Sequence, residues 1–338
     1  MADMERLSDI IGRKNQEQVN RELTGRRIKK MPPPRKPVPF ERWMEQIKKD
    51  FAPLAFAIEA CASAMATLLL KDIGHCTTIL LVDASSAGKT IVLNAVAGLP
   101  ELVRTVDYLT GASFVTNTSN VKKGDLSKLD LLPQIKGKTL ICRDMAPIFA
   151  AREEDLIRMM GVLTRILDGE GYETHTGTHG ARGYSGDYCF VLLGATTPIE
   201  RRVWKAMSRL GPRILCLKLH TAEKSETELA GQLRGTPYQE KLRRCKEVTS
   251  EFFKALWAKC PEGVEWDRSK DPESCVLIIV RCARLLCRLR GQISDTGSSE
   301  WEDDDTGRRH RSATRIRVIG MERPDRMTAG AMPCSVVA

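Results

Sequence analysis

The residues best suited to chemistry lie between Asp83 and Thr90, a stretch that reads Asp-Ala-Ser-Ser-Ala-Gly-Lys-Thr and follows an apolar run at 77–82. An apolar strand that leads through Gly-Lys-Thr into a helix is the pattern of a phosphate-binding loop. Such a loop points backbone N–H groups at phosphates, places its lysine on the β and γ oxygens and offers its hydroxyl to Mg²⁺. The pattern predicts a nucleotide site made by Ser85, Ser86, Ala87, Gly88, Lys89 and Thr90.

One position of this loop departs from the usual pattern. A glycine normally stands five residues before the glycine of Gly-Lys-Thr, and this chain has Asp83 there. Unless it points away from the phosphates, a carboxylate at this place weakens nucleotide binding through like-charge repulsion. The apolar residues 91–97 end at Gly98, as a helix with its C-cap does. This context favours a phosphate-binding loop over a chance Gly-Lys-Thr.

A second element is the apolar strand expected at 138–143, which is followed by Asp144. We expect this carboxylate to hold the water shell of Mg²⁺ beside Thr90. The alternative is an aspartate that only ends the strand and turns the chain. Many ATPases have a glutamate directly after this aspartate, and here Met145 stands there. The catalytic base is therefore unassigned, with three nearby options, Glu153, Glu154 and Asp168.

Two further elements follow along the chain. The strand expected at 188–195 delivers Thr196 and Thr197 at its carboxyl end, where ligands bind in open parallel sheets. Either hydroxyl could contact the γ-phosphate or the attacking water, or could instead begin the next turn or cap its helix. Arg213 stands at the start of a strand expected at 213–219. It is a candidate to neutralise charge on a phosphoryl group, with Arg209 as second choice and a plain surface arginine as the alternative.

The order of these parts resembles the AAA+-type ATPases encoded by phages, plasmids and integrated elements. It is similar to the helicase half of superfamily-three helicases and primase-helicases, over roughly residues 40–220. The resemblance implies a P-loop NTPase (AAA+-like) core that binds ATP and Mg²⁺, and a ring in which the arginine reaches across a subunit interface. It also implies catalytic roles for Lys89, Asp144, Thr196, Thr197 and Arg213, with Thr90 and Asp144 on the metal.

A glycine-rich segment at 169–186 predicts a hairpin. In the helicases that it resembles, a hairpin at this point projects into the pore of the ring and grips a nucleic-acid backbone. By that analogy His175, His179 and Arg182 would contact phosphates. A metal site at the two histidines is a competing interpretation, although their spacing suits a helix and the glycines argue against one. An exposed loop without a ligand is the plainest alternative.

Short apolar strands that alternate with helical patterns between about 75 and 220 predict an α/β fold with a mainly parallel sheet, flanked by N-terminal and C-terminal helices. One expected helix runs from Glu153 to Leu167. The sequence suggests five segments: a basic proline-rich disordered arm at 1–38, a helical lead-in at 39–74, the ATPase core at 75–220, a helical lid at 221–291, and a charged, disordered tail at 292–338.

Composition narrows the setting. The formal net charge of +10 favours a polyanionic partner such as nucleic acid. Eleven cysteines without any C-x-x-C pair indicate reduced thiols in a cytoplasmic protein and give no indication of zinc. The apolar run at 52–70 carries Glu59 and lies just before the loop, so we expect a buried helix and no membrane span.

The leading prediction is an enzyme: an ATP-hydrolysing DNA motor of helicase or primase-helicase type, active as a homo-oligomeric ring with single-stranded DNA in its pore. Its setting would be the replication of a phage or mobile element. A second prediction, motivated by Asp83 and Met145, is a nucleotide-gated binding or loading module with little or no hydrolysis. A small-molecule kinase is a third and less favoured prediction.

Overall fold

The computed structural model describes residues 28–72, 74–116, 126–176, 180–209, 213–219, 225–227, 230, 234–265, 270–289, 292–295, 301–303, 309–311 and 316–320. The chain divides into two compact units, Met1–Trp266 and Asp267–Ala338. The first unit contains the sheet and every candidate site residue. The second contains α13 (Glu273–Leu289) and two antiparallel strand pairs, β8 (Gln292–Asp295) with β11 (Ile316–Gly320) and β9 (Trp301–Asp303) with β10 (Arg309–Arg311).

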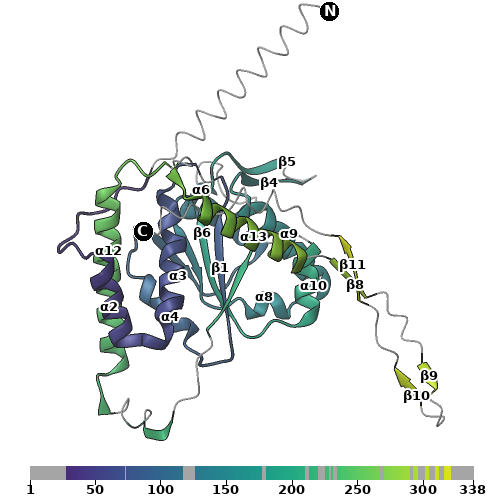
Figure 1. Cartoon of the computed structure of the whole chain (residues 1–338). Helices are drawn as coiled ribbons and strands as arrows, with labels where there is room; N and C mark the ends of the chain where they lie inside the picture. Colours follow the sequence, from purple (N-terminus) through teal and green to yellow (C-terminus); the bar gives the residue numbers. More distant parts are fainter. Residues whose placement is uncertain are drawn as a thin grey trace, which may run out of the picture. The chain divides into compact units, whose positions relative to one another are not determined.

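A five-stranded parallel sheet forms the centre of the first unit (Figure 1). Its order is β2-β3-β6-β1-β7, so β6 separates the strand that leads into the loop from the strand that precedes Asp144. The expected α/β fold with a mainly parallel sheet is confirmed. The strands are β1 (Thr77–Val82), β2 (Val103–Val106), β3 (Thr139–Cys142), β6 (Val191–Thr196) and β7 (Leu215–Lys218).

Strand β1 is covered on both faces, which explains its unbroken apolar sequence. Ile79 and Leu81 point into one hydrophobic cluster, and Leu80 between them points into the other. The first cluster holds helices α2 (Phe40–Phe51), α3 (Ala55–Ala66), α4 (Lys89–Val96) and α12 (Tyr238–Lys259). The second holds α5 (Gly111–Phe114), α7 (Leu131–Ile135), α8 (Ala146–Ala150), α9 (Glu153–Leu167) and α10 (Arg201–Arg209), and α6 (Leu126–Leu129) precedes α7.

The helices that precede β1 are separated by a proline-containing turn and pack in the first hydrophobic cluster. Pro53 lies in a 3₁₀ turn, Ala52–Leu54, that breaks the expected helix between α2 and α3. A second 3₁₀ turn, Thr67–Leu69, follows α3. The stretch Phe40–Leu69 is long and apolar enough to cross a membrane by composition alone, and 61% of its most apolar window is buried. Ile47, Ile58 and Met65 are fully buried in the first cluster, which is the packing of a core helix.

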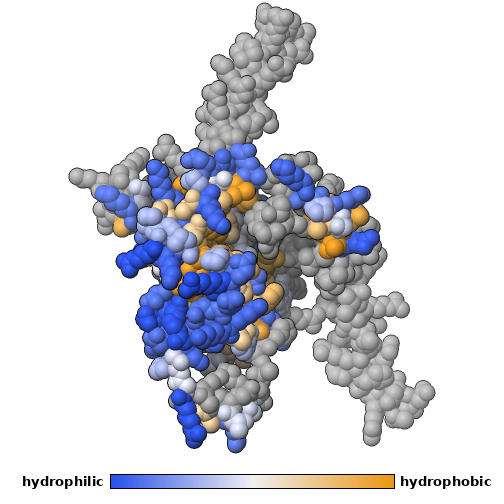
Figure 2. Space-filling model, turned by 60° about the vertical axis from the view of Figure 1, so that its left-hand side comes forward, coloured by the Kyte–Doolittle hydropathy of each residue, from blue (hydrophilic) through white to orange (hydrophobic). Residues whose placement is uncertain are grey.

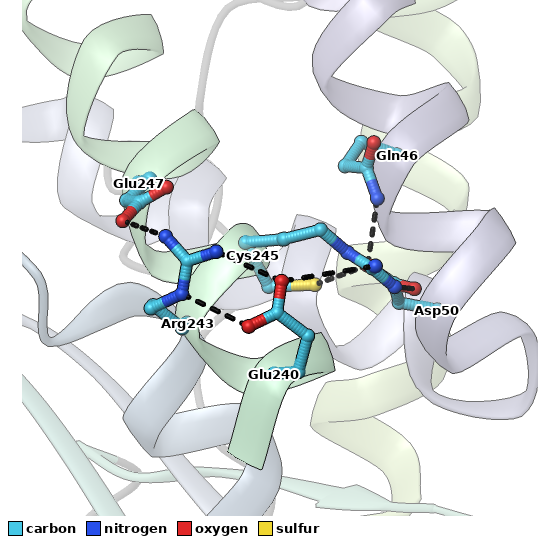
Figure 3. A network of polar contacts seen from close by, with 7 residues as sticks. Gln46, Asp50, Glu240, Arg243, Cys245 and Glu247 are labelled. Carbon is cyan, nitrogen blue, oxygen red and sulfur yellow. Dashed lines mark hydrogen bonds and ion pairs between the residues drawn. The ribbon is translucent and has the colours of Figure 1, made fainter. Parts of the chain in front are cut away.

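Helix α12 is joined to α2 by an ion pair whose carboxylate is buried. The side chain of Asp50 is 2% exposed and accepts hydrogen bonds from Arg244 Nη2 at 2.6 Å and Gln46 Nε2 at 2.6 Å (Figure 3). Burial acts to raise the pKa of Asp50, but the hydrogen bonds from Arg244 and Gln46 outweigh it and hold this pKa below its ordinary value. On the outer side of α12, Arg243 pairs with Glu240 and Glu247, which are exposed and contribute little.

The described part of the N-terminal arm, residues 28–38, lies on this helical layer. Val38 is buried, and the backbone N–H groups of Arg35 and Lys36 donate to Glu251 Oε2 at 2.6 and 3.1 Å. The face that carries α2 and α12 is mostly hydrophilic (Figure 2), as expected for helices whose apolar sides pack inward. Residues 1–27 lie outside the described residues, and the five predicted segment boundaries stay predictions.

We expect Asp50→Asn to lower the free energy of unfolding by about 2 kcal/mol, because Arg244 loses a charged partner. Since the folded-state pKa is lowered, the contribution of Asp50 is complete above pH of about 4 and disappears as the pH falls through the folded-state value. Urea unfolding of both proteins at neutral and acidic pH measures this. The exposed pair variant Glu247→Gln is the control, and equal losses in both variants would contradict the assignment.

Candidate nucleotide-binding site

The loop between β1 and α4 has the backbone of a phosphate-binding turn. Ser86 has a φ of 64° and Gly88 a φ of 96°, both in the left-handed region. A Cβ at position 88 would lie 2.8 Å from Leu54 Cδ1, so space and backbone both require glycine there. Helix α4 begins at the next residue, Lys89. The expected strand, loop and helix are therefore present in this order.

The loop also presents unpaired hydrogen-bond donors. In the described part of the chain, the backbone N–H groups of five loop residues have no protein acceptor: Ser85, Ser86, Gly88, Lys89 and Thr90. Ala87 N–H is used within the turn, at 3.4 Å from the carbonyl of Ala84. Free N–H groups in a left-handed turn at a helix N-terminus suit an anion. The loop therefore fits the phosphates of a nucleotide.

Lys89 lies folded over its own loop. Its Nζ donates to the carbonyl oxygens of Asp83 and Ala84, each at 2.6 Å. Partial burial lowers the pKa of Lys89, while the nearby carboxylates of Asp83 and Asp144 act in the opposite direction. Both carboxylates are thus close enough to act on the lysine. Asp83 Oδ1 accepts the N–H of Ala84 at 2.7 Å, which keeps this carboxylate at the mouth of the loop.

Asp144 stands at the carboxyl end of β3 on the same edge of the sheet. Its Oδ1 accepts the N–H of Ala146 at 2.8 Å, and the side chain is exposed. Thr90 is exposed in the first turn of α4. Within the described residues, no group of three or more His, Cys, Asp and Glu could hold a metal by itself. A carboxylate and a hydroxyl fit Mg²⁺ that is shared with phosphate oxygens.

The two threonines differ in exposure. Thr196 is 2% exposed and ends β6 beside Val82, and its carbonyl accepts the N–H of Asp83 at 3.4 Å. Thr197 is exposed at the next position. Of the two hydroxyls that the sequence offered, the one at 197 is therefore the one open to a ligand. Thr196 instead fixes where the loop leaves the sheet.

Arg213 lies near the amino-terminal ends of the strands, at the opposite end of the sheet from the loop. It precedes Leu215, which pairs with Ile79, whereas the loop follows Val82, which pairs with Lys218. The strand from 213 to 218 spans roughly 16 Å, so Arg213 is far from the loop of its own chain. Its Nε donates to Asp168 Oδ1 at 2.8 Å. Its predicted catalytic role stays a prediction and is compatible only with the site of a neighbouring copy. The side chain of Arg209 lies outside the described part.

The predicted hairpin is present as β4 (Gly171–Thr176) and β5 (Gly180–Ser185), paired antiparallel. His175 is exposed on β4, and His179 lies outside the described residues. Arg182 is largely buried. Its Nη2 donates to Asp130 Oδ2 at 3.0 Å and to Thr116 Oγ1 at 3.1 Å. The predicted contact of this guanidinium with phosphate is untested, and its observed role is to hold the hairpin.

Sequence reasoning missed the acceptor of this contact. Asp130 is 1% exposed and accepts three hydrogen bonds, from Arg182, from the N–H of Thr116 at 2.7 Å and from Tyr184 Oη at 2.7 Å. Burial, together with the hydrogen bond to this carboxylate, raises the pKa of Tyr184. An Asp between two apolar runs carries no signal of such a partner, so only the fold reveals it.

These observations place Lys89, Asp144 and the threonines at one edge, and Arg213 and the hairpin base at the other. A parallel sheet with a left-handed Gly-Lys-Thr turn before α4, and a strand between the loop strand and the Asp strand, decides the fold class. The chain has the fold of a P-loop NTPase. Catalytic roles at its carboxyl edge remain predictions.

Solved structures with similar architecture include the A-form apo NrS-1 C-terminal region, with a TM-score of 0.33, 13% identity, and coverage of 75% of this chain and 58% of that one. JCV helicase has a TM-score of 0.35 and 11% identity, and the match covers 65% of this chain and 55% of that one. A putative ATPase from Cytophaga hutchinsonii has a TM-score of 0.36 and 11% identity, and the match covers 74% of each chain. The chain thus spans little more than half of the first two. No protein-family model and no curated protein matches the sequence. The fold assignment rests on the topology and loop.

We expect Asp83→Asn to bind ATP roughly tenfold more tightly, because it removes a negative charge beside Lys89 while its amide oxygen can still accept the N–H of Ala84. Isothermal titration with ATP measures the change. Glu45→Gln, an exposed charge removal on α2, serves as the control. Unchanged affinity in Asp83→Asn would show that the carboxylate does not oppose the phosphates.

Asp130→Ala should destabilise the protein by about 3 kcal/mol or more, since it leaves the largely buried Arg182 guanidinium without its charge partner. Hydrogen exchange should show faster exchange of β5 amides while β1 amides change least. Tyr184→Phe, which removes one of the three donors, should cost about 1 kcal/mol. Unchanged protection of β5 in Asp130→Ala would contradict the anchoring role.

Proposed function

We propose that this chain binds Mg²⁺-ATP and hydrolyses it as an AAA+-like motor of helicase or primase-helicase type. The observation that carries the proposal is the position of Lys89, which lies over a turn of unpaired N–H groups and within electrostatic reach of Asp144. A lysine, unpaired N–H groups and an acidic strand end are the parts that phosphoryl transfer from ATP requires.

Each residue then has a defined task. The unpaired N–H groups of Ser85, Ser86, Gly88, Lys89 and Thr90 hold the phosphates, and Lys89 exchanges its two carbonyl partners for phosphate oxygens. Thr90 and Asp144 would hold Mg²⁺, which when bound would supply positive charge to offset that of the phosphates. In this proposal Thr197 orients the attacking water, and the carbonyl of Thr196 holds Asp83 at the base of the loop. Arg213 of one copy serves the site of the next in a homo-oligomeric ring.

We extend the proposal to the partner and the setting. The net charge of +10 and the hairpin away from the loop support single-stranded DNA in a ring pore, with His175 and His179 as sequence-predicted contacts, whereas the guanidinium of Arg182 is held by Asp130. Replication of a phage or mobile element in the cytoplasm is the setting that the sequence resemblance implies.

The catalytic base has three candidates. Glu153 and Glu154 begin α9, whereas Asp168 is paired with Arg213 near the amino-terminal ends of the strands.

One observation favours the alternative, a nucleotide-gated loading module with little hydrolysis. Met145 directly follows Asp144 and is 1% exposed. It packs on Gly194 of β6, where any Cβ would collide with its sulfur. The position after the metal-binding aspartate therefore faces the core and carries no carboxylate. Without a base there, ATP could be held and released unchanged.

We expect Lys89→Ala to abolish ATP hydrolysis and leave the unfolding free energy nearly unchanged, because the side chain makes only two bonds at the loop surface. Phosphate release with and without single-stranded DNA, and urea unfolding, measure these effects, with Lys49→Ala on α2 as control. A wild type without DNA-stimulated turnover would exclude the motor. Tight ATP binding with negligible phosphate release in a single turnover would support the loading module.

A further inference from the structure

Two lysines lie at the start of β3, at the edge of the sheet opposite the phosphate loop. Lys136 is exposed, and its Nζ lies 4.8 Å from the ring centroid of Tyr188. The ring of Tyr188 in turn contacts that of Tyr184, with centroids 5.6 Å apart. Tyr184 is held by Asp130. The ammonium group of Lys136 is therefore positioned by an aromatic ring rather than by a carboxylate.

Lys138 has a second ammonium group beside it. The ammonium group of Lys29, from the described part of the arm, lies close to that of Lys138. Burial, and then the neighbouring charge of Lys138, lower the pKa of Lys29 to about 8. In the described residues, no ion pair joins Lys29, Lys136 or Lys138 to a carboxylate. Like charges held together without a counter-charge form an arrangement that an anion would stabilise.

These lysines adjoin the base of the hairpin. The N–H of Gly137 donates to the carbonyl of Cys189 at 2.8 Å, and the N–H of Val191 donates to the carbonyl of Lys138 at 3.0 Å. Cys189 and Val191 directly follow the hairpin in the chain. The guanidinium of Arg182 in the hairpin is already paired with Asp130, whereas none of the three lysines has a carboxylate partner among the described residues. The cations at this place are the exposed Lys136 and the partly buried Lys29 and Lys138.

We propose that Lys29, Lys136 and Lys138 form a binding site for the phosphates of single-stranded nucleic acid at the base of the hairpin, with Tyr188 as a positioning residue for Lys136. The inference rests on the proposed function and names the residues that hold the strand. Ammonium groups as point charges bind phosphates without regard to base sequence. Their place beside the hairpin favours a nucleic-acid strand that passes it over other polyanions.

The test compares two triple variants with the same change in charge. One is K29Q/K136Q/K138Q, and the control is R42Q/K48Q/K49Q, which removes three exposed positive charges from α2. Fluorescence anisotropy of a labelled oligothymidylate is followed against salt concentration. Each lost phosphate contact lowers the slope of log K against log salt by about 0.7, so the site variant should lose about 2 in slope and the control almost nothing. ATP affinity should be equal in both.

A pH series adds a second readout. Affinity of the wild type for the oligonucleotide should fall as the pH rises through about 8, because Lys29 loses its proton in the free protein, where Lys138 is the charged group that faces it. K29Q should lack this component. Equal slopes in the two triple variants, or an unchanged pH dependence in K29Q, would overturn the proposal.

Different results would refute the DNA motor and the lysine site. A wild type that binds ATP and no oligonucleotide at any salt concentration would refute both the DNA motor and this site. A wild type that binds the oligonucleotide and hydrolyses ATP, together with a site variant that equals the control, would refute this site alone. Urea unfolding of each variant shows that lost binding is not lost fold.

Discussion

The architecture depends on the burial of β1 on both of its faces. Because helices cover the sheet on each side, β1 is open to solvent only towards its two ends, and at its carboxyl end the chain turns into α4. That turn requires the left-handed conformation of Gly88 and the absence of a side chain against Leu54. The parallel arrangement then brings the ends of β3 and β6 to the same edge. Asp144, which is far from the loop in sequence, thus comes within electrostatic range of Lys89.

The support of this turn extends well beyond the sheet. Leu54, which packs on Gly88, follows Asp50 by one turn, and Asp50 is joined to Arg244 of α12. Helix α12 also approaches the end of α4, where a Cβ on Gly98 would meet the carbonyl of Lys246 at 2.9 Å. The lead-in helices, α12 and the loop are therefore one packed layer. A change in the ion pair acts on the loop through contact rather than through charge.

The sequence predicted the parts whose signal is local. The apolar run of β1, the periodicity of α9 and the glycines of the hairpin all identify their elements, and β1 and α9 have the expected bounds. Strand β2 was missed because Val-Arg-Thr-Val is short and half polar. The partnership of Arg182 with Asp130, 52 residues away, and the meeting of Lys29 with Lys138 arise only from the tertiary fold. Long-range pairs leave no periodic trace in a single sequence.

The hydrogen bonds of Lys89 have a consequence for ligand discrimination. The ammonium group of Lys89 already donates to two carbonyl oxygens of the loop, at 2.6 Å each. A ligand gains from Lys89 only the difference between those bonds and the new ones, which is small for a neutral or singly charged group. A terminal phosphate chain with several negative charges gives the largest difference. The hydrogen bonds of Lys89 within its own loop thus favour a ligand with several negative charges over one with a single charge.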